Sequence, residues 1–206
     1  MSAGTAVSWS RAHAAAQEVV ELLSPACQRI EIAGSIRRHK AQVHDIEIVV
    51  IATIEGQSRG DLWDTLEKVN LLTGPGGLLD RLSDSGQLPL RAVDVHRKDG
   101  SVEQQVRRGD LYRALEYDGL PVDLFMVYDP DNWGTIFALR TGPGDWNTRL
   151  VTDCQRYLRR VSGTVVYRAG VAVPCPEEAD FFRALGQPWV DPENRHPSLV
   201  DIRAAA

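Results

Sequence analysis

The chain lacks any long apolar run. No stretch of about 18 consecutive apolar residues occurs in its 206 residues, so we expect no membrane-spanning helix and no membrane partner. The first residues, MSAGTAVSWSRAHAAAQ, also lack the charged-then-apolar pattern of a secretory signal peptide. These two absences predict a cytoplasmic protein.

Cysteine is scarce, and its spacing is not that of a metal site. The three cysteines, Cys27, Cys154 and Cys175, lie far apart and form no CxxC pair. Their odd number and wide separation predict free thiols in a reducing compartment. No internal repeat or low-complexity tract occurs either. With 43% apolar and 25% charged residues, the chain suits one compact domain or a domain with a small lobe.

An excess of positive charge is also missing, because the net charge is −5. This balance argues mildly against a dedicated nucleic-acid binder. The distribution is uneven, however: residues 140–168 hold six arginines against two aspartates, a net of +4, so the rest of the chain carries −9. The asymmetry, more than the total, favours an anionic partner for the 140–168 segment.

The periodicity of the apolar residues predicts a mixed α+β fold. Helices are expected over 9–23, 58–72, 77–84, 130–140, 145–160 and 177–185. Strands are expected over 28–33, 44–53, 91–97, 102–107 and 120–128, with a hairpin over 163–174. The Thr-Gly-Pro-Gly stretch at 141–144, with a hairpin pattern and a proline-containing tail after it, predicts a boundary between a domain over 1–142 and a smaller one over 143–206.

Two carboxylates stand at the start of a very apolar segment, DIEIVVIA. On a strand, Asp45 and Glu47 project from the same side with their Cα atoms about 6.5–7 Å apart. The residues beyond them are apolar on both faces, which predicts a central, buried strand. Because two like charges there repel each other and resist desolvation, a divalent cation would stabilise them. The simpler alternative is that both face water at a strand end.

A third carboxylate, Asp123, is the one charged residue in the apolar strand of GLPVDLFMVY. An unpaired carboxylate at such a position is costly. If the two strands are neighbours, the three carboxylates would form an all-oxygen site for Mg²⁺ or Mn²⁺. Such a site suits two-metal phosphoryl transfer, with Asp123 placed to accept a proton from an attacking hydroxyl.

Gly34 and Ser35 separate the first predicted strand from a helical turn, and Arg37 and Arg38 follow at once. The backbone N–H groups and the hydroxyl of such a turn can bind an anion, and glycine lets a phosphate approach the main chain closely. Taken alone, the Gly-Ser pair also fits an ordinary turn.

Together these residues resemble the nucleotidyltransferase superfamily, and most closely its family X branch, the polymerase beta-type DNA polymerases. GSIRRHKAQVHDIEIVV is similar to the family's Gly-Ser and two-carboxylate segment, and VDLFMV to the strand that carries its third carboxylate. WGTIFALRTGPGDWNTRL resembles the Thr-Gly turn and Asn-containing helix that hold the incoming nucleotide. The tail EEADFFRALGQPWVDPENR is similar to the family's thumb segment.

The resemblance implies a palm domain over 1–142, with a small mixed or antiparallel sheet flanked by helices, and a small α/β thumb over 143–206. It implies a monomeric enzyme that adds dNMP from a dNTP to a DNA 3′-hydroxyl in short gap-filling repair synthesis. The metal ligands and catalytic residues would be Asp45, Glu47 and Asp123, holding two Mg²⁺ ions or Mn²⁺ in their place. The nucleotide-binding residues would be Gly34, Ser35, Arg38, Thr141, Gly142 and Asn147.

Arginines are the expected DNA contacts. On a helix over 145–160, Arg149, Arg156 and Arg160 fall on one stripe with Arg159 beside it, which suits a surface that follows phosphates. A solvated basic face is the alternative. The resemblance itself places Arg149 on the template side.

Two departures from the family keep other functions open. The second carboxylate is Glu47, where these polymerases usually carry Asp, and the residues before 28 leave room for one helix but not for the family's lyase and fingers domains. These features and the acidic net charge suit a superfamily enzyme that acts on RNA, a protein or a small molecule, or an untemplated terminal transferase. A non-catalytic module that keeps the fold is the third alternative.

Overall fold

The computed structural model describes residues 5–58, 66–97, 99–155 and 158–196. Its helices and strands form a mixed α+β fold, as the periodicity predicts. The chain divides into two compact units: the first consists of Met1–Ile32 and Gln42–Tyr128, and the second of Ala33–Ala41 and Asp129–Ala206. This division differs from the expected boundary at 142.

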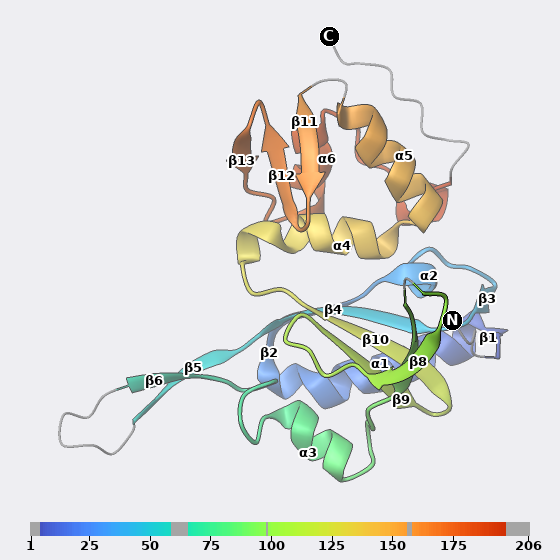
Figure 1. The fold of residues 1–206 in the computed structure, drawn as a ribbon, viewed down its shortest axis with the longest axis vertical. Coiled ribbons are helices and arrows are strands. Elements are labelled where there is room, and N and C mark those ends of the chain that lie inside the picture. The colour runs from blue at the N-terminus through green and yellow to red at the C-terminus, as the bar shows by residue number, and fades with distance from the viewer. Residues whose placement is uncertain (1–4, 59–65, 98, 156–157, 197–206) are drawn as a thin grey trace. The chain divides into compact units, whose positions relative to one another are not determined.

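The first unit is built on a four-stranded sheet with the strand order β2-β4-β10-β9 (Figure 1). Its strands are β2 (Cys27–Ile32), β4 (Ile46–Ala52), β9 (Tyr112–Tyr117) and β10 (Leu120–Met126). β4 and β10 run parallel, whereas the two outer strands run antiparallel to their neighbours. On β4, Ile48, Val49 and Val50 are fully buried although they alternate between the two faces. The prediction of a central strand is therefore confirmed.

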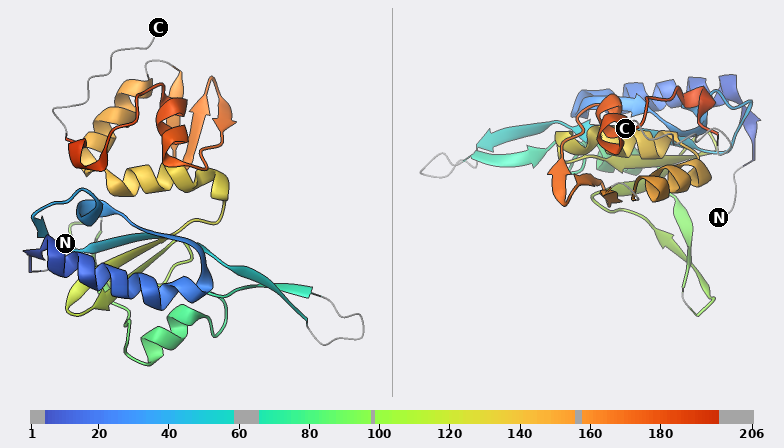
Figure 2. Two further views of the ribbon diagram at one scale, coloured as in Figure 1. Left: turned by 180° about the vertical axis from the view of Figure 1, so that it is seen from behind. Right: turned by 90° about the horizontal axis from the view of Figure 1, so that it is seen from above.

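Helix α1 (Trp9–Leu23) packs against β2 and β4 (Figure 2, left). It starts where the Ser8 side chain accepts a hydrogen bond from the N–H of Arg11, at 3.4 Å, and it ends at Ser24, before Pro25. The buried side is made of Ala12, Ala15, Ala16, Val19 and Leu23. Among the described residues, none of the helices is both long and apolar enough to cross a membrane.

Smaller elements complete the first unit. The short strands β1 (Val7–Ser8) and β3 (Gln42–Val43) pair with each other, and α3 (Leu78–Asp84) follows a glycine-rich turn. β7 (Ala92–His96) and β8 (Val102–Val106) form a hairpin that projects from the unit (Figure 2, right). Asp99 and Gly100 lie in its turn: Gly100 has φ +84, and the Ser101 N–H donates to Asp99 Oδ1 at 2.9 Å.

The predicted helix over 58–72 is wrong in its described part. Instead, β5 (Ile54–Ser58) and β6 (Leu66–Asn70) pair as antiparallel strands. β6 ends in a local turn at Asn70, whose Oδ1 accepts from the N–H groups of Leu72 and Thr73, both at 2.9 Å. This local turn gives the backbone an alternative to helical hydrogen bonds.

The sequence pattern also missed β9. This strand pairs with β10 across a tight turn in which Asp118 and Gly119 have φ +49 and +71. An Asp-Gly pair between two strands is a strong hairpin signal, so this strand could have been predicted from the sequence.

The second unit has three longer helices and a three-stranded sheet. The helices are α4 (Trp133–Thr141), α5 (Gly144–Cys154) and α6 (Glu178–Leu185), and the sheet runs in the order β11 (Arg159–Ser162), β12 (Val165–Arg168), β13 (Val171–Val173). The short helix α2 (Gly34–Arg37) and the 3-10 turns η2 (Pro130–Asn132) and η4 (Pro192–Asn194) complete the unit, with η1 (Ser24–Ala26) in the first. Trp146, Phe181 and Phe182 anchor its core, and α6 packs against β11 and β12.

The predicted helix over 145–160 is wrong beyond residue 154. α5 ends at Cys154, and β11 begins at Arg159. Between them Leu158 has φ +58, a left-handed conformation that no right-handed helix can contain. The pairing of Val161 with Val166 in an antiparallel ladder fixes the strand instead.

Candidate active site

The structure places two of the three predicted metal ligands side by side on neighbouring strands. Glu47 on β4 and Asp123 on β10 are register partners in the parallel pair. Residues paired in this way point to the same face, on strands about 4.8 Å apart. Asp45 lies immediately before β4, two residues ahead of Glu47, and all three carboxylates are partly exposed. The condition that the two carboxylate-bearing strands be neighbours is therefore met.

Asp123 already has two partners from within the first unit. Arg91 Nη2 donates to Asp123 Oδ1 at 3.0 Å, and the hydroxyl of Tyr112 donates to the same oxygen at 2.8 Å. The Arg91 main chain is held in turn, because its N–H donates to the carbonyl of Ala114 at 2.8 Å. The Asp123 carboxylate, expected to be unpaired, thus forms an ion pair with Arg91 and a second hydrogen bond with Tyr112. These two contacts offset the cost of removing the carboxylate from water.

Tyr112 stands on β9, diagonally across from Asp123. Burial of its ring, followed by the hydrogen bond to Asp123, raises the pKa of the Tyr112 hydroxyl well above its usual 10. The hydroxyl therefore stays a proton donor to Asp123 at neutral pH. Neither Tyr112 nor Arg91 was predicted as a site residue, because β9 was missed and no short motif marks Arg91.

The structure does not show a complete metal-binding cluster. Within the described ranges 5–58, 66–97, 99–155 and 158–196, no group of three or more His, Cys, Asp or Glu side chains is arranged to hold a metal ion. The three predicted ligands do supply the right donor chemistry, since carboxylate oxygens are the ligands that Mg²⁺ prefers. They remain candidates on donor type and on the register of Glu47 with Asp123.

The Gly-Ser segment belongs to the second unit, where it forms α2. Gly34 has φ +62, which explains why glycine stands at its start. The neighbouring Ser35 Oγ is buried and has no hydrogen-bond partner among the residues that the structure describes. A buried hydroxyl without a partner is unusual and indicates a position where a ligand oxygen or N–H would complete the hydrogen bonding.

The two arginines after Ser35 both contact Thr141, at the end of α4. Arg37 Nη1 donates to Thr141 Oγ1 at 2.7 Å, and Arg38 Nη1 donates to the Thr141 carbonyl in a short hydrogen bond. The structure thus brings Gly34, Ser35 and Arg38 together with Thr141 in one unit. The Arg38 side chain therefore binds the main chain of the predicted nucleotide-binding turn.

A buried ion-pair network supports this arrangement. Glu178 on α6 accepts two hydrogen bonds from Arg37, both at 2.8 Å, and one from the fully buried Arg195, also at 2.8 Å. Burial acts to raise the pKa of Glu178, but the hydrogen bonds from both arginines outweigh it and hold the pKa at about 2. The Arg37 guanidinium also stacks 4.0 Å from the ring centre of Phe137.

The turn at Thr141-Gly142 is closed by Asn147 from α5. Asn147 Nδ2 donates to the carbonyls of Leu139, at 2.7 Å, and Gly142, at 3.1 Å. Its Oδ1 is buried and has no hydrogen-bond partner within the described ranges. The Asn147 Nδ2 group thus donates both its hydrogen bonds to the turn, and its Oδ1 can accept one from a ligand. A Cβ at Gly142 would overlap that Oδ1, so only glycine fits there.

The predicted stripe of arginines does not exist, because the helix that should carry it ends at Cys154. Arg149 is exposed on α5, whereas Arg159 and Arg160 lie on β11. Arg156 lies outside the described residues. Arg159 Nη1 donates to the Leu185 carbonyl at 2.9 Å, and the Arg160 guanidinium lies 5.3 Å from the ring centre of Tyr167.

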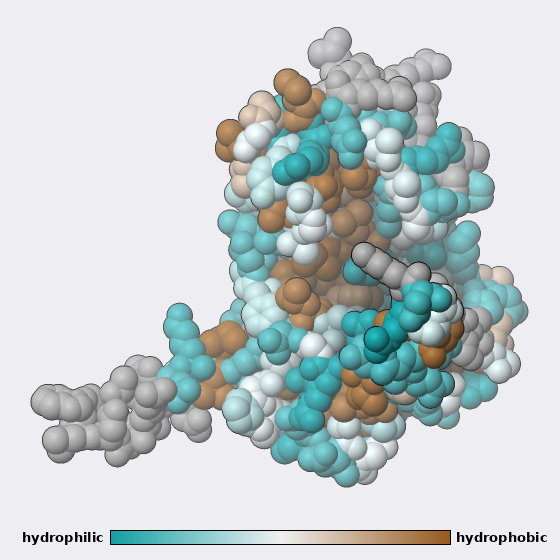
Figure 3. All heavy atoms as spheres, in the orientation of Figure 1, coloured by the Kyte–Doolittle hydropathy of each residue, from teal (hydrophilic) through white to brown (hydrophobic). Residues whose placement is uncertain are grey.

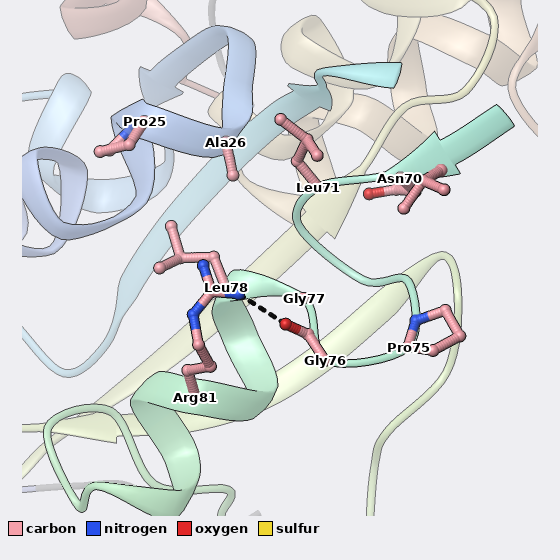
Figure 4. Close-up of a pocket in the computed structure, with 10 residues that line it drawn as sticks. Pro25, Ala26, Asn70, Leu71, Pro75, Gly76, Gly77, Leu78 and Arg81 are labelled. Carbon is pink, nitrogen blue, oxygen red and sulfur yellow. Dashed lines mark hydrogen bonds between the residues drawn. The ribbon is translucent and has the colours of Figure 1, made fainter. Parts of the chain in front are cut away.

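A pocket of about 270 Å³ in the first unit contains none of the predicted site residues (Figure 4). It lies between the 25–26 turn, the end of β6 and the start of α3. Its charged side chain, Arg81, donates to the carbonyl of Gly76 at 2.5 Å. Among the described residues that line this pocket there is no carboxylate, thiol or histidine, so they offer no candidate catalytic group.

The carboxylates Asp45, Glu47 and Asp123 belong to the first unit, and the predicted nucleotide-binding residues belong to the second. Within the first unit Asp123 is held by Arg91 and Tyr112, and within the second unit Arg38 and Asn147 hold the 139–142 main chain. No protein-family model matches the chain, and no curated protein matches its sequence. The functional assignment therefore depends on the residues themselves and on the geometry within each unit.

Proposed function

We propose that the protein is a polymerase beta-type nucleotidyltransferase with a palm-like first unit and a thumb-like second unit. It adds dNMP from a dNTP to a DNA 3′-hydroxyl and releases pyrophosphate, in short gap-filling synthesis. The observation that carries the proposal is the register of Glu47 with Asp123 in a parallel strand pair, with Asp45 two residues before Glu47. In-line phosphoryl transfer needs oxygen ligands of this kind held on a rigid mount.

Asp45, Glu47 and Asp123 would hold Mg²⁺, or Mn²⁺ in its place. When bound, the metal would supply Lewis-acid stabilisation of the charge that develops on the transferring phosphoryl group. The strands β4 and β10 keep the carboxylates in place, since Ile46, Ile48 and Leu124 are fully buried.

Asp123 is the proposed proton acceptor. Arg91 and Tyr112 both donate to its Oδ1. Among the described residues, no side chain or main-chain group donates a hydrogen bond to its Oδ2. Oδ2 is therefore the atom that would take the proton from the attacking hydroxyl. The two donors fix the orientation of the carboxylate for this step.

The second unit would bind the nucleotide. Ser35 Oγ and Asn147 Oδ1 are both buried and lack a hydrogen-bond partner among the described residues. Ser35 would donate to a phosphate oxygen, and Asn147 would accept from a donor on the base or the sugar. Arg38 and the glycine at 142 would shape the turn beneath the sugar.

One assay tests the proposal. The protein is incubated with gapped DNA, primed template, single-stranded DNA or RNA, each with labelled dNTP or NTP and with Mg²⁺ or Mn²⁺. We expect templated extension of gapped and primed DNA. Asp123→Asn should abolish it, whereas Asp118→Asn, an exposed carboxylate of the same unit, should leave it unchanged.

The outcomes separate the alternatives. Extension that Asp123→Asn does not reduce would overturn the proposed site. Addition to single-stranded DNA alone would indicate an untemplated transferase, and labelling of RNA alone would indicate an enzyme that acts on RNA. No transfer to any acceptor, from protein with an intact cooperative unfolding transition, would favour a non-catalytic module.

A further inference from the structure

A second pocket, of about 450 Å³, lies in the second unit and is distinct from the nucleotide-binding residues described above. It is lined by Gln155, Leu158, Arg159, Arg160, Tyr167 and Gly170. We call it the β11–β12 pocket, because it forms where β11 begins and β12 ends. Its volume is in the range of small-molecule sites.

The pocket combines an aromatic ring with positive charge. Arg160 and Tyr167 are register partners on β11 and β12, and the Arg160 guanidinium lies 5.3 Å from the ring centre. They share the face opposite to Val161 and Val166, which pack into the core of the unit. Arg159 reaches the other side, where its Nη1 donates to the Leu185 carbonyl at 2.9 Å. The partly buried Tyr167 ring and the exposed Arg160 therefore lie together on the face of the sheet that is turned away from the core, where a ligand can reach them.

Two residues at the pocket have left-handed backbone conformations. Leu158 and Ala169 have φ +58 and +48, although neither is glycine, and the Ala169 N–H donates to the Leu158 carbonyl at 2.8 Å. The Leu158 side chain is 77% exposed. Ala169 and Gly170, with φ +48 and +82, form the two-residue turn between β12 and β13, where a tight hairpin requires a positive φ at both positions. In Figure 3 the surface over β11–β13 mixes hydrophilic and hydrophobic residues.

We propose that the β11–β12 pocket binds an unpaired nucleotide of a nucleic-acid strand, with the base against Tyr167 and Leu158 and a phosphate on Arg160. Stacking on an aromatic ring beside an arginine is how proteins hold single strands without reading their sequence. In a duplex the base faces are covered by their neighbours, so the ring selects unpaired nucleotides. An acidic peptide would satisfy the arginines but would leave the ring and the exposed leucine without a flat partner.

This inference deepens the proposed function, and it rests on that function for the choice of a nucleic acid as the ligand. It names the form of nucleic acid that the second unit recognises: the single-stranded segment next to a primer end or gap. The role is binding rather than catalysis. Its failure and the failure of the proposed transferase can therefore be told apart.

The test is fluorescence anisotropy of the full chain with a labelled oligonucleotide of about 12 nucleotides, within the site size of known single-strand binders. Single-stranded DNA, the same sequence in RNA, and a duplex of equal length form three arms. We expect the single strands to bind more tightly than the duplex. Tyr167→Ala and Arg160→Gln should each raise the Kd about tenfold, whereas Tyr167→Phe should keep most of the affinity.

The matched control is Arg183→Gln. Arg183 is an exposed arginine on α6 that pairs with Asp180 at 2.6 Å, so its loss changes the net charge without touching the pocket. It should change the Kd less than twofold. An equal effect of Arg183→Gln and Arg160→Gln would overturn the proposal, because general charge would then explain binding. A duplex bound more tightly than single strands, or an unlabelled poly-glutamate that competes equally well, would also overturn it.

Asp123→Asn separates the two proposals. It should abolish nucleotide transfer and leave single-strand binding unchanged. Binding that depends on Tyr167 and Arg160 without any transfer by the wild type would sustain this inference and reject the transferase. Nucleotide transfer by the wild type, with no difference in Kd between wild type and Arg160→Gln, would sustain the transferase and reject this inference. Arg160 is exposed, so this variant stays informative even if Tyr167→Ala fails to fold.

Discussion

Glu47 and Asp123 face the same side of the first unit's sheet, as register partners of the parallel strands β4 and β10. The residues that flank them on these strands, Ile46, Ile48, Val122 and Leu124, are all fully buried. The two carboxylates are therefore mounted on strands that are packed into the core of the unit. Small changes in their length or charge should have large effects on any chemistry that they perform.

Glu47→Gln removes the charge at constant shape, and Glu47→Asp shortens the side chain by one methylene. If Glu47 is a metal ligand, we expect Glu47→Gln to lower kcat by about 100-fold or more, because a displaced or neutral ligand misplaces the reacting groups. Glu47→Asp should retain part of the activity. Single-turnover extension of gapped DNA measures both, and equal activity of Glu47→Gln and wild type would rule out this role.

Tyr112→Phe tests the hydrogen bond to Asp123. The change should lower the free energy of unfolding by about 1 kcal/mol, since a partly buried carboxylate loses a donor. Combined with Asp123→Ala in a double-mutant cycle, it should show a coupling of about 1 kcal/mol in urea unfolding. Tyr117→Phe is the matched control, because Tyr117 donates to Glu18 at 2.6 Å on the exposed surface and should cost much less. Additive effects of the Tyr112 and Asp123 changes would contradict the coupling.

The central strands could be predicted from the sequence because both of their faces are apolar. The carboxylates were found for the same reason, as they interrupt that pattern. The errors occurred where the observed structure departs from helical periodicity: the pairing of β5 with β6 replaces the helix expected over 58–72, and α5 ends at Cys154, with Leu158 in a left-handed conformation before β11.

Partners from distant parts of the chain were beyond the sequence pattern. Arg91 reaches Asp123 from 32 residues away, and Arg37 reaches Glu178 from 141 residues away. No spacing rule connects such residues, because the tertiary fold alone brings them together. Arg37 was therefore noticed only as a neighbour of Arg38, and its network was missed.

Glu178 should make stability depend on pH. Its pKa in the folded state is about 2, below the usual 4.5, so the folded state binds the proton less well than the unfolded state. The stabilisation is then present above pH 4.5 and is lost as the pH falls toward 2, by about 3 kcal/mol in all. Urea unfolding of wild type and Glu178→Gln between these pH values measures the difference.

Glu178→Gln should also destabilise the second unit at neutral pH by about 3–5 kcal/mol, because Arg37 and the buried Arg195 lose their counter-charge. This variant should lack the part of the pH dependence that Glu178 provides. Glu193→Gln, an exposed carboxylate near His39, serves as the control and should keep the wild-type curve. A Glu178→Gln curve parallel to that of the wild type would contradict the assignment.

Gly142→Ala and Gly144→Ala form a matched pair, two residues apart. A Cβ at Gly142 would overlap Asn147 Oδ1 and lie 2.8 Å from Trp146 Cε3, whereas a Cβ at Gly144 meets nothing within 4 Å. We expect Gly142→Ala to lower the free energy of unfolding by about 1–3 kcal/mol, the usual cost of overpacking. Gly144→Ala should be neutral or stabilising by up to about 1 kcal/mol, since alanine restricts the unfolded chain.

Gly142→Ala and Gly144→Ala also test whether the turn binds the nucleotide. Gly142→Ala displaces the Asn147 amide that closes the predicted nucleotide-binding turn, so the KM for dNTP should rise about tenfold or more, as expected when a positioned hydrogen-bond partner is lost. Gly144→Ala should leave the KM unchanged. Steady-state extension at varied dNTP concentration measures both. A Gly142→Ala protein that is destabilised but keeps the wild-type KM would show that the turn is closed for packing alone.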